Sequence, residues 1–243
     1  MRMLHFANRN FKEIMRDPLN LAFLFGFPVV LLLLLSAIQA NIPVSLFEIQ
    51  HLAPGIAVFG LAFMTLFSAT LIAKDRHSSF MHRLYTTPMT PLDFILGYTL
   101  PLIPIALSEC AVAYIVAIIL GLKIHLNILL SILFSLPIAL LYIGLGLLCG
   151  SVFNDKQVGG ICGALLTNLS AWLSGIWFDL DLIGGAFKTA AYLLPFVHAV
   201  EMERAVILGS LADALPHLLW VLGYAVVSLV VAVLLFLRQM KKQ

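Results

Sequence analysis

Long apolar runs separated by short polar segments dominate the chain. Six runs approach or exceed 20 residues, with only isolated charges inside them, at about 19–38, 52–73, 92–120, 128–153, 158–178 and 216–237. A helix needs about 20 mainly apolar residues to cross a bilayer, and barrel strands are far shorter. The pattern therefore predicts an all-α membrane protein with six transmembrane helices.

The stretch 182–212 is apolar but broken by Gly184, Gly185, Lys188 and Pro195. We interpret it as an outer re-entrant hairpin between the fifth and sixth spans, not as a seventh crossing. With six crossings most basic residues lie on one side, which marks the cytoplasmic side. We therefore expect a multi-pass protein of the cytoplasmic (inner) membrane with both termini in the cytoplasm.

Residues 1–17 carry apolar and basic residues at helical spacing and precede the transmembrane domain, 18–243. The basic set comprises Arg2, Arg9, Lys12 and Arg16. This pattern predicts an amphipathic helix in the cytoplasmic interface. Asp17 can cap the first span, and Pro18 suits its first position. The alternative is a basic leader that only sets the topology.

Composition excludes several classes of function. Of the 243 residues, 62% are hydrophobic and 11% are charged, which is incompatible with an ordinary soluble domain. The three cysteines fall inside predicted spans and indicate no disulfide framework. No phosphate-cradling Gly-x-x-x-x-Gly-Lys-Ser/Thr motif is present, so the sequence carries no nucleotide-binding loop of this kind. We expect no catalytic residue, no metal site and no nucleic-acid partner.

The segment 74–91 is too patterned for a simple hairpin. Its apolar residues Phe80, Met81, Leu84 and Tyr85 recur at helical spacing, and a Thr-Pro-Met-Thr-Pro run follows them. Thr90, Pro91 and Asp93 then suit the start of a new helix. The pattern predicts a short cytoplasmic helix that offers a docking surface to another protein.

The run from Phe80 to Gly97 resembles the stretch between the second and third spans of type-2 ABC permeases. Shared features are the pair Arg83-Leu84, the turn Thr87-Pro88 and an early glycine in the next span, Gly97. The lead-in 74–79 differs from the family's Glu-rich, Gly-Thr run. The segments 174–178 and 192–201 resemble the family's fifth span and outer hairpin.

This resemblance implies the transmembrane subunit of a bacterial or archaeal ABC exporter. It implies a homodimer engaging two copies of a separate ATPase, with ATP and Mg on that ATPase and no cofactor on this chain. The ATPase-coupling residues would be Phe80, Met81, Arg83, Leu84, Tyr85, Thr87 and Pro88. Substrates would be hydrophobic drug-like, antibiotic or lipid-like molecules, with export of a polysaccharide or another polymer as the alternative.

Polar residues inside the spans are the candidates for the substrate pathway. Glu109 stands out because an ionised group in hydrocarbon is costly, although a protonated or hydrogen-bonded structural role is the alternative. The full set is Thr65, Ser68, Glu109, Asn168, Ser170 and Trp172. Gly184, Gly185 and Pro195 would let an outer gate bend. The acids Asp179, Asp181, Glu201, Glu203 and Asp213 would make the outer region acidic.

Two rival classes remain open. An intramembrane serine peptidase would need Ser174 within hydrogen-bond reach of His198 or His217. A secondary carrier would need coupling charges near the midplane, for which Glu109 is the only candidate.

Overall fold

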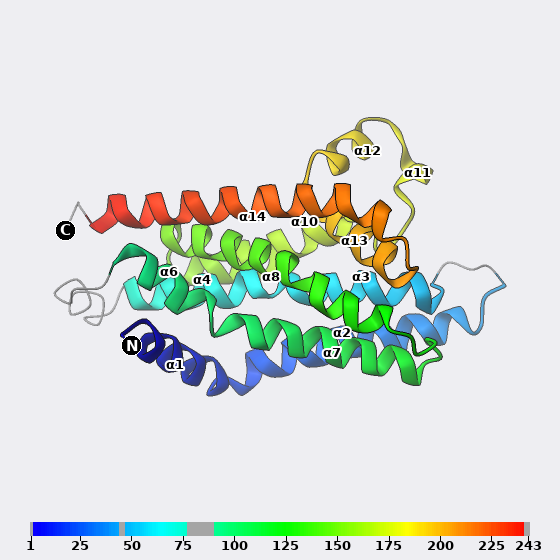
Figure 1. Ribbon diagram of the computed structural model, residues 1–243, viewed down its shortest axis with the longest axis horizontal. Helices are drawn as coiled ribbons and strands as arrows, with labels where there is room; N and C mark the ends of the chain where they lie inside the picture. The colour runs from blue at the N-terminus through cyan, green and yellow to red at the C-terminus, as the bar shows by residue number, and fades with distance from the viewer. Residues whose placement is uncertain (1, 44–46, 77–89, 241–243) are drawn as a thin grey trace.

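The computed structural model describes residues 2–43, 47–76 and 90–240, and these form a bundle of helices (Figure 1). The helices are α1 (Arg2–Met15), α2 (Pro18–Gln39), α3 (Ile49–Ala62), α4 (Met64–Arg76), α6 (Pro91–Thr99), α7 (Leu102–Ile119), α8 (Asn127–Val152), α9 (Asp155–Val158), the π-helix η1 (Gly159–Leu166), α10 (Thr167–Trp172), α11 (Leu180–Ile183), α12 (Gly185–Tyr192), α13 (Pro195–Ile207) and α14 (Leu211–Met240). No strand occurs in these ranges.

Five helical stretches of the described residues are long and apolar enough to cross a membrane. They are Pro18–Gln39, Ile49–Arg76, Leu92–Ile119, Asn127–Val152 and Leu211–Leu235. The second and third are each built from two consecutive helices, α3 with α4 and α6 with α7. The all-helical, multi-pass character predicted from the apolar runs is confirmed, and five of the six predicted crossings have a helical counterpart.

The sixth predicted crossing, 158–178, has a different form. Its helical part is divided into α9, η1 and α10 and ends at Trp172. In a π-helix each backbone N–H bonds to the carbonyl five residues earlier. The Thr167 hydroxyl, just after η1, has the same spacing, because it donates to the carbonyl of Cys162 at 2.8 Å. The three glycines of η1, Gly159, Gly160 and Gly163, favour departure from α-helical geometry. The crossing count of six stays a prediction.

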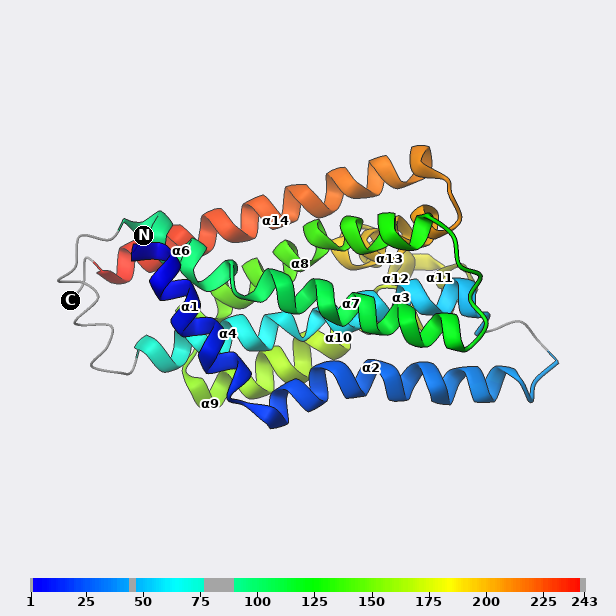
Figure 2. The ribbon, with the colours of Figure 1, turned by 60° about the horizontal axis from the view of Figure 1, so that its bottom comes forward.

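The two chain ends lie at the same end of the bundle, whereas α11, α12 and α13 lie at the opposite end (Figures 1 and 2). Gly184 lies between α11 and α12, and Gly185 is the first residue of α12. Their φ values of +61° and +57° fall in a backbone region that suits glycine. Pro195 is the first residue of α13, where its missing N–H costs nothing. The segment 182–212 is thus a series of short helices, of which α13 is largely buried.

A close helix contact in the core joins α4 to α8 through two glycines of α8. A Cβ at Gly150 would stand 2.5 Å from the Ala69 carbonyl oxygen, and one at Gly146 would collide with Thr65 and Ser68. The Ser68 hydroxyl donates to the Met64 carbonyl at 2.8 Å and lies 3.2 Å from that of Ile143. This is the small-x-x-x-small packing that lets helix backbones approach in membranes.

We predict that Gly150→Ala destabilises the protein, because the added methyl group meets backbone atoms that cannot move aside. Overpacking of this kind costs about 1–3 kcal/mol. The midpoint of thermal unfolding in detergent should fall by several degrees. Gly223→Ala in α14 is the matched control, since nothing lies within 4 Å of its added methyl group. Equal midpoints for the two variants would contradict the assignment of this contact.

Candidate functional site

Three helices meet at the end of the bundle that holds the chain termini: α1, the end of α4, and α6. Two predicted caps are confirmed here. The Asp17 carboxylate accepts from the backbone N–H of Asn20 (3.2 Å) at the start of α2. Thr90 and Asp93 form a reciprocal capping box at the start of α6, with Pro91 as its first residue. The break at Asp17 lets α1 lie across the bundle (Figure 2).

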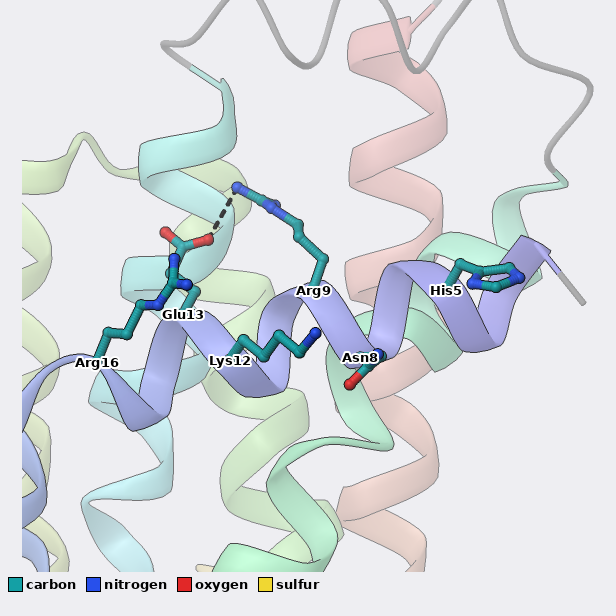
Figure 3. Close-up of a pocket in the computed structure, with 6 residues that line it drawn as sticks. All are labelled: His5, Asn8, Arg9, Lys12, Glu13 and Arg16. Carbon is teal, nitrogen blue, oxygen red and sulfur yellow. Dashed lines mark ion pairs between the residues drawn. The ribbon is translucent and has the colours of Figure 1, made fainter.

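The carboxylate of Asp75 is the centre of this junction. Arg9 binds it with two nitrogens, at 2.6 and 2.8 Å, and the Tyr98 hydroxyl donates to it at 2.8 Å. Asp75 and Tyr98 are buried, and Arg9 also pairs with Glu13 at 2.8 Å (Figure 3). Partial burial opposes the charge of Arg9, but the hydrogen bonds and charge of Asp75 outweigh it and raise the pKa of the guanidinium. Arg9 therefore keeps its positive charge at this junction.

Apolar and amide contacts seat α1 on α6. The Asn10 side chain, fully buried, donates to the carbonyl of Gly97 at 3.0 Å. The Phe6 ring packs edge-on against Phe94 and Tyr98, with centroids 5.9 and 5.0 Å away. A Cβ at Gly97 would collide with the Phe6 ring. The early glycine of the third span is thus the site on which α1 docks. We call Phe6, Arg9, Asn10, Asp75 and Tyr98 the α1–α4–α6 junction.

The junction frames the predicted coupling segment. Helix α4 ends at Arg76 and α6 begins at Pro91, so the junction fixes the chain on both sides of 77–89. Arg76 additionally donates to the Gly150 carbonyl of α8 at 2.8 Å. The seven predicted coupling residues lie outside the described residues; they are Phe80, Met81, Arg83, Leu84, Tyr85, Thr87 and Pro88.

The predicted pathway residues of the second and fifth spans do not share one environment. Thr65 and Ser68 are buried in the contact between α4 and α8, and Ser170 is buried and donates to the Thr167 carbonyl (2.8 Å). Asn168 and Trp172 are exposed. The Asn168 amide donates back to the Ala164 carbonyl at 2.8 Å. Only Asn168 and Trp172 therefore present their side chains to a partner or a substrate.

Glu109 lies in a helix interface, not on an open surface. It is 1% exposed, and it packs so closely on Gly60 of α3 that a Cβ there would collide with the carboxyl group. The Cys110 thiol lies 3.6 Å from Oε2, and Oε1 has no hydrogen-bond partner among the described residues. An unpaired carboxylate is costly in such a place, which favours a neutral carboxyl group.

Glu203 corrects the expectation of an acidic outer face. It is 1% exposed and points between α7 and α8, where Tyr114 donates to its carboxyl group at 3.1 Å and Ser131 is also bonded to it. The cause is the helical period of α13, which places Glu203 on the same buried face as Ala199 and Val206. That spacing was visible in the sequence and could have identified Glu203 as an inward residue.

The residues considered for a peptidase are engaged elsewhere. The Ser174 hydroxyl donates to the Ala171 carbonyl at 2.9 Å. His198 and His217 contact each other through their Nδ1 atoms at 2.8 Å, and Nε2 of His198 bonds to the Tyr192 carbonyl. No nucleophile–base pair forms among these three residues.

A known protein family matches this chain. The chain matches the family model described as ABC-2 type transporter over residues 2–208, which includes the junction, the buried carboxyl groups and α13. No curated protein matches the chain. A match over most of the chain shows the family, whose members are membrane-spanning permease components of ABC transporters. The chain therefore belongs to the ABC-2 type transporter family.

Proposed function

We propose that the chain is the permease subunit of an ATP-driven exporter of hydrophobic drug-like, antibiotic or lipid-like molecules. Two copies would form a homodimer in the cytoplasmic membrane, and each copy would engage one separate ATPase that binds ATP and Mg. The observation that carries this proposal is the α1–α4–α6 junction around Asp75. It holds the helices on both sides of 77–89, the segment that the ATPase would contact.

The positions of the chain ends support six crossings with both termini in the cytoplasm. An even number of crossings returns the chain to its starting side, and both ends lie at the same end of the bundle (Figure 1). The segment 155–172 would provide the crossing missing from the five candidate stretches. Helices α11 to α13 would then form the outer re-entrant region.

Coupling requires a rigid path from the ATPase to the spans. Movement at 77–89 would reach α4 through Asp75 and α6 through Tyr98, which are bonded to each other. Helix α1 joins α4 through Arg9 and α6 through Asn10. Charge-assisted hydrogen bonds are stronger than neutral ones, and a pair of them fixes geometry as well. The two bonds between Arg9 and Asp75 would therefore keep α1 and α4 in the same relative position as they move. The coupling role of Phe80 to Pro88 is part of this proposal.

The exposed face of η1 and α10 suits a second copy and an apolar substrate. Its large side chains are apolar and well exposed: Leu165 (62%), Leu169 (45%) and Trp172 (54%). Asn168 stands among them as an exposed amide. A polar group facing lipid is unfavourable, whereas it can bond across a helix interface. The single amide among apolar groups favours lipid-like substrates over a polysaccharide, which needs more polar partners.

The outer gate of the proposal consists of α11, α12 and α13, with hinges at Gly184, Gly185 and Pro195. Arg204 of α13 donates to the Gly175 carbonyl at 3.0 Å and pairs with Glu201 at 3.0 Å. The Tyr224 hydroxyl of α14 donates to the Leu193 carbonyl at 2.7 Å. The Glu201 pair lies within α13, so the bonds that would hold the gate shut are those of Arg204 to Gly175 and of Tyr224 to Leu193, which could be exchanged as it opens.

We predict that Asp75→Asn and Arg9→Gln each lower transport about tenfold or more, because hydrogen bonds to charged groups contribute about 1.5–3 kcal/mol. Hydrolysis of ATP by the co-expressed ATPase should persist, since its own site is intact. The measurement is export of hydrophobic dyes and fluorescent phospholipids from proteoliposomes, alongside ATP hydrolysis.

The double variant Arg9→Gln/Asp75→Asn should recover part of the transport, because neither charge is left unpaired. Glu13→Gln is the matched control, since it removes only the partly exposed partner of Arg9 and should have little effect. Undiminished transport in both single variants would refute the coupling role of the junction.

We predict that Leu165→Cys and Asn168→Cys form intersubunit disulfides on mild oxidation in native membranes. The background would lack Cys110, Cys149 and Cys162, the three native cysteines. Val226→Cys on α14, also exposed, is the control and should remain monomeric on denaturing gels. Cross-linking at position 226 but not at 165 or 168 would place the dimer contact on the other face.

A further inference from the structure

Helix α1 presents two surfaces that the junction does not use. Its buried stripe, Phe6, Asn10 and Ile14, repeats every four residues and contacts the bundle. Basic residues form a second stripe, and exposed apolar residues form a third. Since each residue turns a helix by about 100°, the three stripes divide its circumference into nearly equal sectors. Among the described residues, the first sector contacts the bundle along its length, whereas the second does so through Arg9.

The basic sector consists of His5, Arg9, Lys12 and Arg16, which are four, three and four residues apart. With Asn8 and Glu13 they line a cavity of about 410 Å³ (Figure 3). Arg9 is committed to Asp75 and Glu13. Lys12 and Arg16 are exposed and form no ion pair with any of the described residues. Two cationic side chains are thus left for an anion.

The apolar sector is formed by Leu4, Phe11 and Met15, which are 60%, 36% and 51% exposed. It continues on the first turns of α2, where Leu19 and Phe23 are 67% and 55% exposed. Because α2 enters the membrane directly after Asp17, α1 lies at the depth at which headgroups meet acyl chains. Exposed apolar groups are stable at that depth only when acyl chains cover them.

We propose that α1 binds an anionic phospholipid of the surrounding leaflet. Lys12 and Arg16 would hold the headgroup phosphate, the Asn8 amide could donate a further hydrogen bond, and the acyl chains would lie along Leu4, Phe11 and Met15. An acidic surface of a soluble partner would match the basic sector but would leave the apolar sector in water. A phospholipid satisfies both sectors at once, and charge complementarity selects an anionic one.

The test uses the full-length chain in nanodiscs of phosphatidylcholine with increasing phosphatidylglycerol, without ATPase or ATP. Its outcome is therefore independent of the proposed transport. Native mass spectrometry would count the phosphatidylglycerol retained. Each removed basic charge should weaken retention of phosphatidylglycerol about fivefold, so the double variant Lys12→Gln/Arg16→Gln should retain it about 25-fold more weakly than the parent protein. Raising the salt concentration should weaken retention by the parent protein. Lys156→Gln/Arg238→Gln, which removes two exposed charges elsewhere, should retain the lipid.

A second measurement covers the apolar sector and does not depend on retention. A spin label at position 11 should be accessible to oxygen dissolved in the acyl region, whereas a label at position 8 should be accessible to a water-soluble nickel complex. Equal retention of phosphatidylglycerol by the Lys12/Arg16 variant and the parent overturns the proposal. A variant that keeps the lipid but no longer binds the ATPase would instead assign the basic sector to that protein.

Discussion

The packing of α1, α4 and α6 depends on the hydrogen bonds of one buried carboxylate, that of Asp75 at the end of the apolar helix α4. Asp75 is 3% exposed, and burying a carboxylate without partners is strongly unfavourable. Two nitrogens of Arg9 and the Tyr98 hydroxyl supply those partners. Since Arg9 belongs to α1 and Tyr98 to α6, satisfying one charge also fixes the positions of two helices. Removing the charge would leave α1 held only by its apolar stripe and by Asn10.

Features set by local chemistry or by the bilayer could be predicted from the sequence. Long apolar runs identify crossings because a bilayer offers no water to backbone groups. The Asp17 and Thr90 caps depend on residues at most three positions away. The pairing of Arg9 with Asp75 joins residues 66 positions apart. Both residues are recognisable as charged from the sequence, but nothing in the sequence indicates that Arg9 and Asp75 form a pair.

The direction in which a polar side chain points was the other unpredictable quantity. Ser68 and Asn168 have the same status in the sequence, a polar residue within an apolar run. Ser68 is sealed against α8 because Gly146 allows the backbones to approach, whereas Asn168 lies on an uncovered face. Glu203 points inward for a related reason, since its place in the helical period of α13, and not its charge, decides its direction. Glycines on the facing helix decide which polar groups become interior.

The π-helix also determines which side chains of α10 are available. A π turn takes up one more residue than an α turn, so everything that follows it is rotated about the helix axis relative to an uninterrupted α-helix. The rotation in η1 is what sets Thr167 and Ser170 inward and Asn168 and Trp172 outward. A single-residue insertion or deletion in this segment would turn α10 by about 100° about its axis and so change which of its side chains are exposed. The length of this segment, as well as its composition, therefore decides which side chains the helix exposes.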